Sequence, residues 1–206
     1  MSVTAIIPLK PPARAKSRLL LDAETRVLLA NAFAHDLIDQ CLNCADIDEC
    51  VVVGTGPPEA PVPQLADPGQ GLNYALSAAA TTIPATDSVV ILMGDLPCVR
   101  SEDLSLALAY WRDDAAALSN GAFVSDLAGI GTTAVLGQAG QVQPEFGARS
   151  RAAHHSNGLV ELRQPELRRL RRDVDSLVDL ADALRLGVGP HTRACVADLD
   201  LVPTLS

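Results

Sequence analysis

Three acidic residues stand where their side chains could hold a divalent metal. Asp95 follows the apolar segment 88–93 after a single glycine, and Asp173 and Asp175 are separated by one residue. A carboxylate directly after a buried strand points into the crevice where α/β proteins bind ligands, and it usually binds a metal that bridges phosphates. We predict that Asp95 shares a metal with one residue of the pair, and that the other residue caps the following helix.

A cluster of cations follows the first apolar segment, 3–9. It contains Lys10, Arg14, Lys16 and Arg18, and no other lysine occurs in the chain. Charge-assisted hydrogen bonds are worth roughly 1.5–3 kcal/mol each, so this segment is typical of a triphosphate clamp. The alternative is a solvated basic loop, which is unusual in an acidic protein. The segment lacks the glycine patterns of dinucleotide-binding and P-loop sites.

Two stretches of small residues have the composition of phosphate-binding loops. One is 131–133, which contains Thr133, and the other is 146–150, in which Gly147 precedes Ser150 at the start of a predicted helix. Exposed amides and hydroxyls at such a helix start bind phosphate, although ordinary turns have the same composition. Arg149 could pair with a carboxylate or phosphate of the ligand, or point to water. We expect His154 and His155 to lie behind the site or on the surface.

These residues must be positioned by the elements around them. The hydrophobic pattern predicts strands at 3–9, 50–54, 64–66, 88–93, 132–136, 158–162 and 170–174, and helices at 22–44, 71–82, 176–186 and from 101 onward, where Ser101 is the expected cap. Strands and helices alternate, which indicates one α/β domain over 1–206, with a mainly parallel sheet and helices on both faces. The carboxyl ends of the strands would then place the acidic and basic residues at one edge.

Composition limits the function classes. The chain has 206 residues, a formal net charge of −9 and 48% hydrophobic residues. The negative charge argues against nucleic-acid binding, and no apolar run is long enough for a membrane span. The five cysteines are odd in number and scattered, which suits a reducing, cytoplasmic location. The Cys41/Cys44 pair closes a predicted helix rather than opening one, so we expect neither a redox nor a zinc role for it.

The ordered motifs resemble the guanylyltransferases of coenzyme F420 (deazaflavin) biosynthesis, which activate phosphoenolpyruvate or 2-phospho-L-lactate with GTP. The matching pieces span nearly the whole chain: I-P-L-K at 7–10, A-K-S-R-L at 15–19, Q-G-L-N at 70–73, G-D-L-P at 94–97, G-T-T-A-V-L at 131–136, F-G-x-x-S-x-x-x-H at 146–154 and D-V-D at 173–175. The resemblance implies a nucleotide-diphospho-sugar-transferase-like (GT-A/MobA-like) fold. It also implies an enzyme that transfers GMP from GTP to a small phosphorylated acid and releases pyrophosphate.

The resemblance also implies roles for individual residues. Magnesium would be held by Asp95 and Asp173, and the acceptor by Thr133, Gly147 and Ser150. The GTP phosphates would meet Lys10, Lys16 and Arg18, with Lys16 counted among the catalytic residues together with the two aspartates. Gly71 and Asn73 would lie along the nucleoside.

The sequence leaves the acceptor and the oligomeric state open, and it leaves two alternative functions. Ala148-Arg149 departs from the Pro-Gly that the family usually has in the acceptor loop, so phosphoenolpyruvate, 2-phospholactate and 3-phosphoglycerate all remain candidate acceptors. A molybdenum-cofactor or sugar-phosphate nucleotidyltransferase is an alternative, but such enzymes carry a glycine-rich loop after the first strand. A non-catalytic nucleotide-binding protein is another, against which the intact Asp95 and Asp173 argue. Oligomeric state is not predicted.

Overall fold

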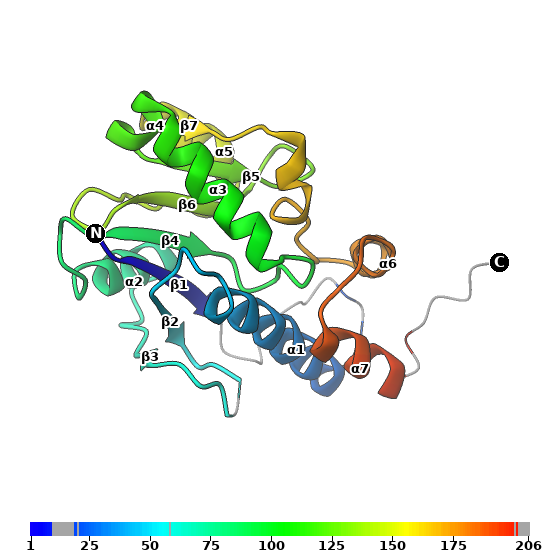
Figure 1. Ribbon diagram of the computed structural model, residues 1–206. Helices are drawn as coiled ribbons and strands as arrows, with labels where there is room; N and C mark the ends of the chain where they lie inside the picture. The colour runs from blue at the N-terminus through cyan, green and yellow to red at the C-terminus, as the bar shows by residue number, and fades with distance from the viewer. Residues whose placement is uncertain (10–18, 20, 58, 200, 202–206) are drawn as a thin grey trace.

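One seven-stranded sheet forms the centre of the protein (Figure 1). The computed structural model describes residues 1–9, 19, 21–57, 59–199 and 201. The strand order is β3-β2-β1-β4-β6-β5-β7. The strands are β1 Val3–Leu9, β2 Glu49–Gly54, β3 Gln64–Leu65, β4 Ser88–Leu92, β5 Ala122–Ser125, β6 Thr132–Gln138 and β7 Val160–Glu161.

The sheet is mainly parallel, as predicted. β1 pairs in parallel with β2 and β4, β2 with β3, and β5 with β7, whereas β6 runs antiparallel to both β4 and β5. The carboxyl ends of β1, β2 and β4 therefore meet at one edge, and β6 contributes its amino end to the same edge. Residues at the start of β6 and residues just after β4 are thereby brought side by side.

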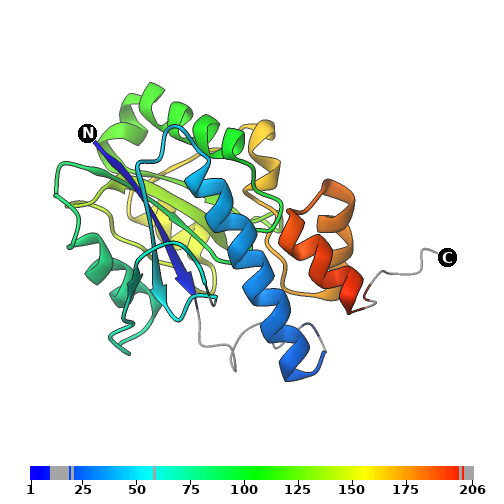
Figure 2. The same cartoon turned by 60° about the horizontal axis from the view of Figure 1, so that its bottom comes forward.

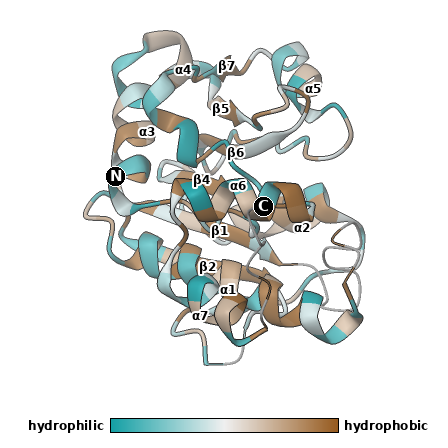
Figure 3. Ribbon diagram, turned by 90° about the vertical axis from the view of Figure 1, so that its right-hand side faces the viewer, coloured by the Kyte–Doolittle hydropathy of each residue, from teal (hydrophilic) through white to brown (hydrophobic). Residues whose placement is uncertain are grey.

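Helices cover both faces of the sheet, which confirms the predicted architecture. The helices are α1 Ala23–Leu42, α2 Leu72–Ala80, α3 Ser101–Asp113, α4 Ala115–Asn120, α5 Ser150–Ser156, α6 Leu177–Leu186 and α7 Pro190–Asp198, with a 3₁₀ turn, η3, at Pro165–Arg169. One core cluster packs α1, α3 and α4 on one face, and a second packs α2 on the other. Figure 2 shows α1 running alongside β1 and β2, and in Figure 3 apolar segments predominate at the centre of the sheet.

A third core cluster joins α6 and α7 to the outer side of α1. It includes Leu29 and Phe33 of α1, Leu180 of α6 and Val196 of α7. Asp36 of α1 is 1% exposed, and its carboxylate accepts hydrogen bonds from the amides of His191 and Thr192, each at 2.9 Å. Asp36 therefore caps the start of α7, whose first amides have no partner within their own helix.

Several boundaries differ from the predicted ones. The strand expected at 170–174 is absent from the described sheet: the 3₁₀ turn Pro165–Arg169 precedes an irregular segment there. Leu167, Leu170 and Val174 are all buried, and their spacing of three and four residues is that of a helix rather than of a strand. Ser101 is the first residue of α3 rather than its cap, and the Asp103 carboxylate accepts from the Arg100 amide at 2.8 Å.

Candidate functional site

Glycines allow close packing at the carboxyl edge of the sheet. A side chain at Gly94 would overlap the side chain of Leu9, and a side chain at Gly54 would overlap the Leu9 carbonyl. Gly54 also has φ +103°, a value that side chains disfavour. Leu9 is the last residue of β1 and contacts the position directly before Asp95. The end of β1 and the acidic segment after β4 therefore share one point of the edge.

The two acidic segments meet at this edge. The Val174 amide donates a hydrogen bond to the Asp95 carbonyl at 3.1 Å. Burial, followed by repulsion from the carboxylates of Asp95, Asp175 and Asp126, raises the pKa of Asp173 to about 7. Burial is the larger cause, and the part of the rise that comes from repulsion reflects negative charge that a cation would neutralise. The structure thus brings Asp95 and the Asp173–Asp175 pair together, as the sequence predicted.

The local conformation of the pair differs from the prediction. Asp173 and Asp175 lie in an irregular segment, not on a strand, so strand alternation does not set their directions. The predicted cap by one of these aspartates is also wrong, because Ser176 is the N-cap of α6. The Ser176 hydroxyl and the Asp179 carboxylate hydrogen-bond each other and the backbone amides at positions 179 and 176. This reciprocal arrangement satisfies the first amides of α6.

The donor set suits a metal that is shared with a substrate. Among the residues that the structure describes, no group of three or more His, Cys, Asp or Glu could hold a metal ion by itself. Magnesium in phosphate-handling sites is usually bound by one or two carboxylates, and phosphate and water oxygens complete its octahedron. Asp95 and Asp173 match that smaller requirement.

The predicted acceptor residues lie beside the acidic site because β6 is antiparallel. The Met93 amide donates to the Thr133 carbonyl at 2.9 Å, which places Thr133 next to the end of β4. Thr133 and Ser150 are 1% and 2% exposed. The Arg151 amide donates to the Ile130 carbonyl at 3.1 Å and so attaches the start of α5 to the turn before β6. The Thr133 hydroxyl donates to the Val124 carbonyl at 3.3 Å, so Thr133 and Ser150 are buried small polar residues in two segments next to the acidic site.

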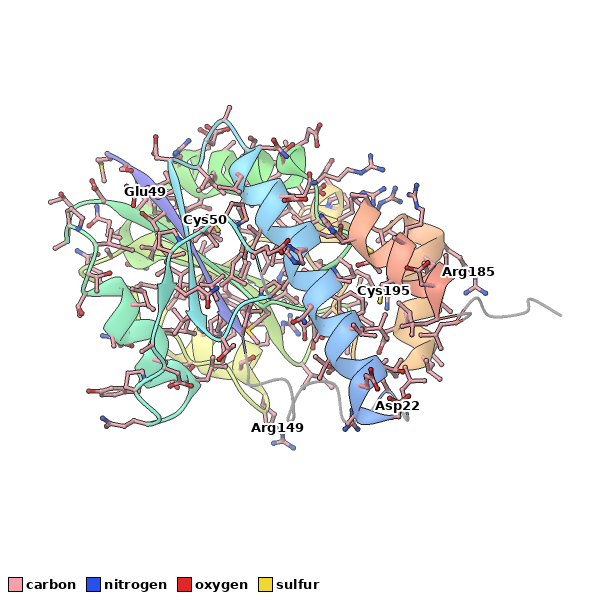
Figure 4. The ribbon with its side chains drawn as sticks, turned by 90° about the horizontal axis from the view of Figure 1, so that it is seen from below. Asp22, Glu49, Cys50, Arg149, Arg185 and Cys195 are labelled. Atoms are coloured by element: carbon pink, nitrogen blue, oxygen red, sulfur yellow. The ribbon has the colours of Figure 1, made fainter. Side chains whose placement is uncertain are left out.

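Arg149 has an unusual backbone conformation. It is the N-cap of α5 and lies in the left-handed region at φ 61°, ψ 31°. Its side chain is exposed and extends away from the body of the protein (Figure 4). A left-handed conformation costs a non-glycine residue about 1–2 kcal/mol. The turn therefore directs the guanidinium toward solvent, directly before Ser150 at the start of α5.

Asn73 is engaged with the acceptor loop. Its amide nitrogen donates to the Phe146 carbonyl at 3.0 Å, and its amide oxygen accepts from the Phe146 amide at 2.8 Å. Gly71, predicted to lie along the nucleoside together with Asn73, is the exposed N-cap of α2 at φ 98°. The segment that begins α2 is thus tied to the loop that precedes α5.

His154 supports the same loop from the other side. The Glu145 amide donates to His154 Nε2 at 3.0 Å, so the ring proton is on Nδ1, which lies 3.0 Å from Thr132 Oγ1. Burial lowers the pKa of His154 to about 4, and the ring is fully buried against Phe123 and Phe146. His154 is therefore a neutral residue behind the site, as the sequence suggested.

Other charged residues at this edge were not singled out from the sequence. Asp126 accepts from the amides of Ile130 and Gly131 at 2.9 and 2.8 Å and so shapes the turn before Thr133. An aspartate followed by glycines at 129 and 131 is a recognisable turn signal. Glu161, whose side chain is 3% exposed, pairs with Arg151, His155 and Arg163. No sequence pattern indicates that grouping, because two partners lie on α5 and the third, Arg163, follows β7.

The basic residues of the predicted triphosphate clamp, Lys10, Lys16 and Arg18, lie outside the described residues. Their assignment stays a prediction. The described chain ends at Leu9 on one side of this segment, at the edge shared with Gly94.

The fold is shared with known nucleotidyltransferases. Residues 21–171 match the model of the MobA-like NTP transferase domain. A Desulfovibrio desulfuricans G20 protein described as a nucleotide-diphospho-sugar transferase superposes with a TM-score of 0.70 at 16% identity, over 97% of this chain and 96% of that chain. A 4-diphosphocytidyl-2C-methyl-D-erythritol synthase gives a TM-score of 0.58 at 16% identity, over 90% and 97%. The predicted nucleotide-diphospho-sugar-transferase-like fold is therefore confirmed.

Sequence relatives give a narrower assignment. Phosphoenolpyruvate guanylyltransferases of Streptomyces coelicolor and Mycobacterium leprae are 41% and 35% identical to this chain. The first match covers 97% of this chain and 98% of the relative, and the second covers 96% and 95%. The chain belongs to the phosphoenolpyruvate guanylyltransferase family. No helix in the described ranges has the length and apolar character of a membrane span.

Proposed function

We propose that this chain transfers GMP from GTP to a small phosphorylated carboxylic acid, and that phosphoenolpyruvate is the acceptor. The single observation that carries the proposal is the hydrogen bond from Val174 to Asp95, because it joins two acidic segments at the edge of the sheet where β6 begins. Carboxylates that hold a metal on phosphates, next to small polar groups that hold a second phosphate, are what nucleotidyl transfer needs. The names of the relatives support the choice of acceptor.

In the proposed reaction, an oxygen of the acceptor phosphate attacks the α-phosphorus of GTP. The bond between the α-phosphorus and the bridging oxygen to the β-phosphate breaks, and pyrophosphate leaves. The acceptor phosphate is already ionised, so no residue has to remove a proton from it. Thr133, Gly147 and Ser150 hold the acceptor, Gly71 lies on the nucleoside side, and the cations of the 10–18 segment, Lys16 among them, meet the triphosphate.

Magnesium is the cofactor that this donor set fits. Bound by Asp95 and Asp173, it would neutralise charge on the triphosphate and orient the α-phosphate. Without it, the acidic cluster around Asp173 would repel the substrate phosphates. The raised pKa of Asp173 does not prevent metal binding, because a bound cation favours the ionised carboxylate.

The proposed product belongs to the activation step of coenzyme F420 biosynthesis, and we place the enzyme in the cytoplasm, where GTP is available. The five free cysteines suit such a reducing compartment. The acidic net charge gives no support to a nucleic-acid partner.

The test is pyrophosphate release from GTP against a panel of phosphoenolpyruvate, 2-phospho-L-lactate and 3-phosphoglycerate, with and without magnesium. We expect release with phosphoenolpyruvate, dependence on magnesium, and loss with ATP or CTP as donor. Release only with a sugar phosphate or molybdopterin would assign the chain to the alternative nucleotidyltransferases. GTP binding without release with any acceptor would indicate a non-catalytic nucleotide-binding protein.

A further inference from the structure

We infer that Asn73 is a positioning residue for the acceptor, acting through the backbone of Phe146 rather than by contact with the nucleoside. The inference rests on the proposed function and changes the role expected for Asn73. Its starting point is that both polar atoms of the side chain are hydrogen-bonded to a single residue of the acceptor loop.

An asparagine amide has one face that donates and one that accepts. At Phe146 it meets the main-chain carbonyl and amide together, at 3.0 and 2.8 Å, as a neighbouring β-strand would. Phe146 is 7% exposed, and its ring packs in the same core cluster as Leu76 and Ala79 of α2. Buried main-chain groups need partners, so loss of the amide would leave two groups of Phe146 unsatisfied.

The residues after Phe146 depend on its position. Gly147 and Arg149 both have positive φ, at 144° and 61°, and the Ser150 amide donates to the Gly147 carbonyl at 3.1 Å. The bend between Phe146 and Ser150 is therefore short and tightly turned. A shift of Phe146 would move Gly147, one of the proposed acceptor-binding residues, while Ser150 stays anchored by α5.

A second side chain, that of His154, is hydrogen-bonded to the same loop. Glu145 is held by His154 of α5, whereas Phe146 is held by Asn73 of α2. Two adjacent loop residues are thus fixed by side chains from two different helices. Of Asn73 and His154, Asn73 belongs to the segment that was expected to meet the nucleotide. Its substitution therefore distinguishes support of the acceptor loop from contact with the nucleoside.

The experiment compares Asn73→Ala, Asn73→Asp and wild type, with Asn157→Ala as the matched control. Asn157 is the exposed C-cap of α5 and lies at the other end of that helix. We measure KM for phosphoenolpyruvate and for GTP separately, together with amide hydrogen exchange of peptides covering 141–149. Asparagine to aspartate keeps the acceptor for the Phe146 amide and removes the donor to its carbonyl, so it tests graded rescue.

We expect Asn73→Ala to raise the KM for phosphoenolpyruvate at least tenfold, with the KM for GTP within threefold of wild type. Exchange in 141–149 should accelerate, Asn73→Asp should be intermediate on both measures, and Asn157→Ala should resemble wild type. An equal or larger rise in the KM for GTP overturns the inference and returns Asn73 to the nucleoside. Unchanged exchange in the loop also overturns it.

The wild-type measurements judge the proposed function independently. If wild type releases no pyrophosphate with any acid of the panel, the proposed function fails, and the exchange measurement still decides whether Asn73 holds the loop. If the alanine variant does not fold, the aspartate variant carries the comparison, because its shape is nearly that of asparagine.

Discussion

The amide of Val174 donates a hydrogen bond to the carbonyl of Asp95 at 3.1 Å. Val174 itself is fully buried, and its neighbours Asp173 and Asp175 are only partly so. The burial of Val174 therefore fixes the position of the backbone that carries Asp173 and Asp175 at the edge of the sheet. Main-chain pairing and the burial of Val174 position the second acidic segment, although the neighbouring carboxylates repel that of Asp173.

Asp95→Asn and Asp173→Asn should each reduce magnesium-dependent turnover by roughly 100- to 1000-fold, the range seen when one charge-stabilising group is removed from a dry site. Both changes keep the side-chain shape and remove one charge from a cluster of repelling carboxylates, so the unfolding temperature without magnesium should equal or exceed that of wild type. Steady-state pyrophosphate release and thermal unfolding test this. Asp46→Asn, which removes the exposed partner of Arg112 away from the acidic segments, is the control and should stay active. Near-normal turnover in either variant would mean that it is no metal ligand.

Lys16→Ala should raise the KM for GTP more than the KM for the acceptor, because the proposed partner of its ammonium is the triphosphate. Lys16→Arg keeps the charge and should lose less. Both Michaelis constants must be measured in the same series. A change confined to the acceptor would reverse the assignment of the two subsites.

Arg149→Ala should weaken acceptor use at least tenfold, about 1.4 kcal/mol, if the guanidinium pairs with the acceptor. An exposed arginine contributes about 0–1 kcal/mol, whereas loss of a desolvated charge pair costs roughly 2–5 kcal/mol. The left-handed backbone at φ 61° makes Arg149→Gly a necessary companion, since glycine removes the same side chain without backbone strain. Equal losses in kcat/KM for both variants would assign the effect to the guanidinium.

The control for this series is Arg185→Ala, because Arg185 is an exposed arginine on α6, well away from Arg149 (Figure 4). It should leave the specificity constant unchanged. If kcat/KM for the acceptor in Arg149→Ala stays within threefold of wild type, the Arg149 side chain does not bind the acceptor.

Protonation of His154 should contribute a loss of stability as pH decreases from about 6.5 to about 4, whereas Asp173, whose pKa is raised to about 7, contributes the opposite change over the same range. The pKa of His154 is lowered to about 4 by burial, from an ordinary value of 6.5, so between these values the unfolded chain binds a proton that the folded chain does not. The loss should reach on the order of 3 kcal/mol by the lower limit. Urea unfolding across this range, in wild type and in His154→Gln, measures it. The glutamine variant should lose this part of the pH dependence, and an identical slope in the two proteins would contradict the assignment.

Much of the fold was predictable because long apolar runs and clear caps mark the central elements. The strand at 3–9 was placed to the residue, and Asp22 caps α1 where the helix was expected to begin. The short strand β5 and the helices α4 and α7 were not predicted. Ala122–Ser125 has only four residues, and its burial comes from strands on either side, which a local pattern does not contain.

The site was predictable in its parts and less so in its connections. Asp95 was identified from its place after a buried strand, and the order of the motifs supplied Thr133, Gly147 and Ser150. The interaction of Asn73 with Phe146 joins residues 73 positions apart, and no local pattern encodes it. The strand predicted at 170–174 failed for a related reason: Leu170 and Val174 are buried in two different core clusters, so the segment crosses between them and does not pair with a strand.

The cap that Asp36 places on α7 has a consequence for how the chain assembles on the ribosome. The amides of His191 and Thr192 leave the ribosome long after Asp36, and Val174 leaves it long after Asp95. The parallel pairs β1–β2 and β1–β4 can form while synthesis continues, but both of these late contacts must wait for the last part of the chain. Until residue 174 has left the ribosome, the growing chain therefore carries only one of the two acidic segments of the candidate site.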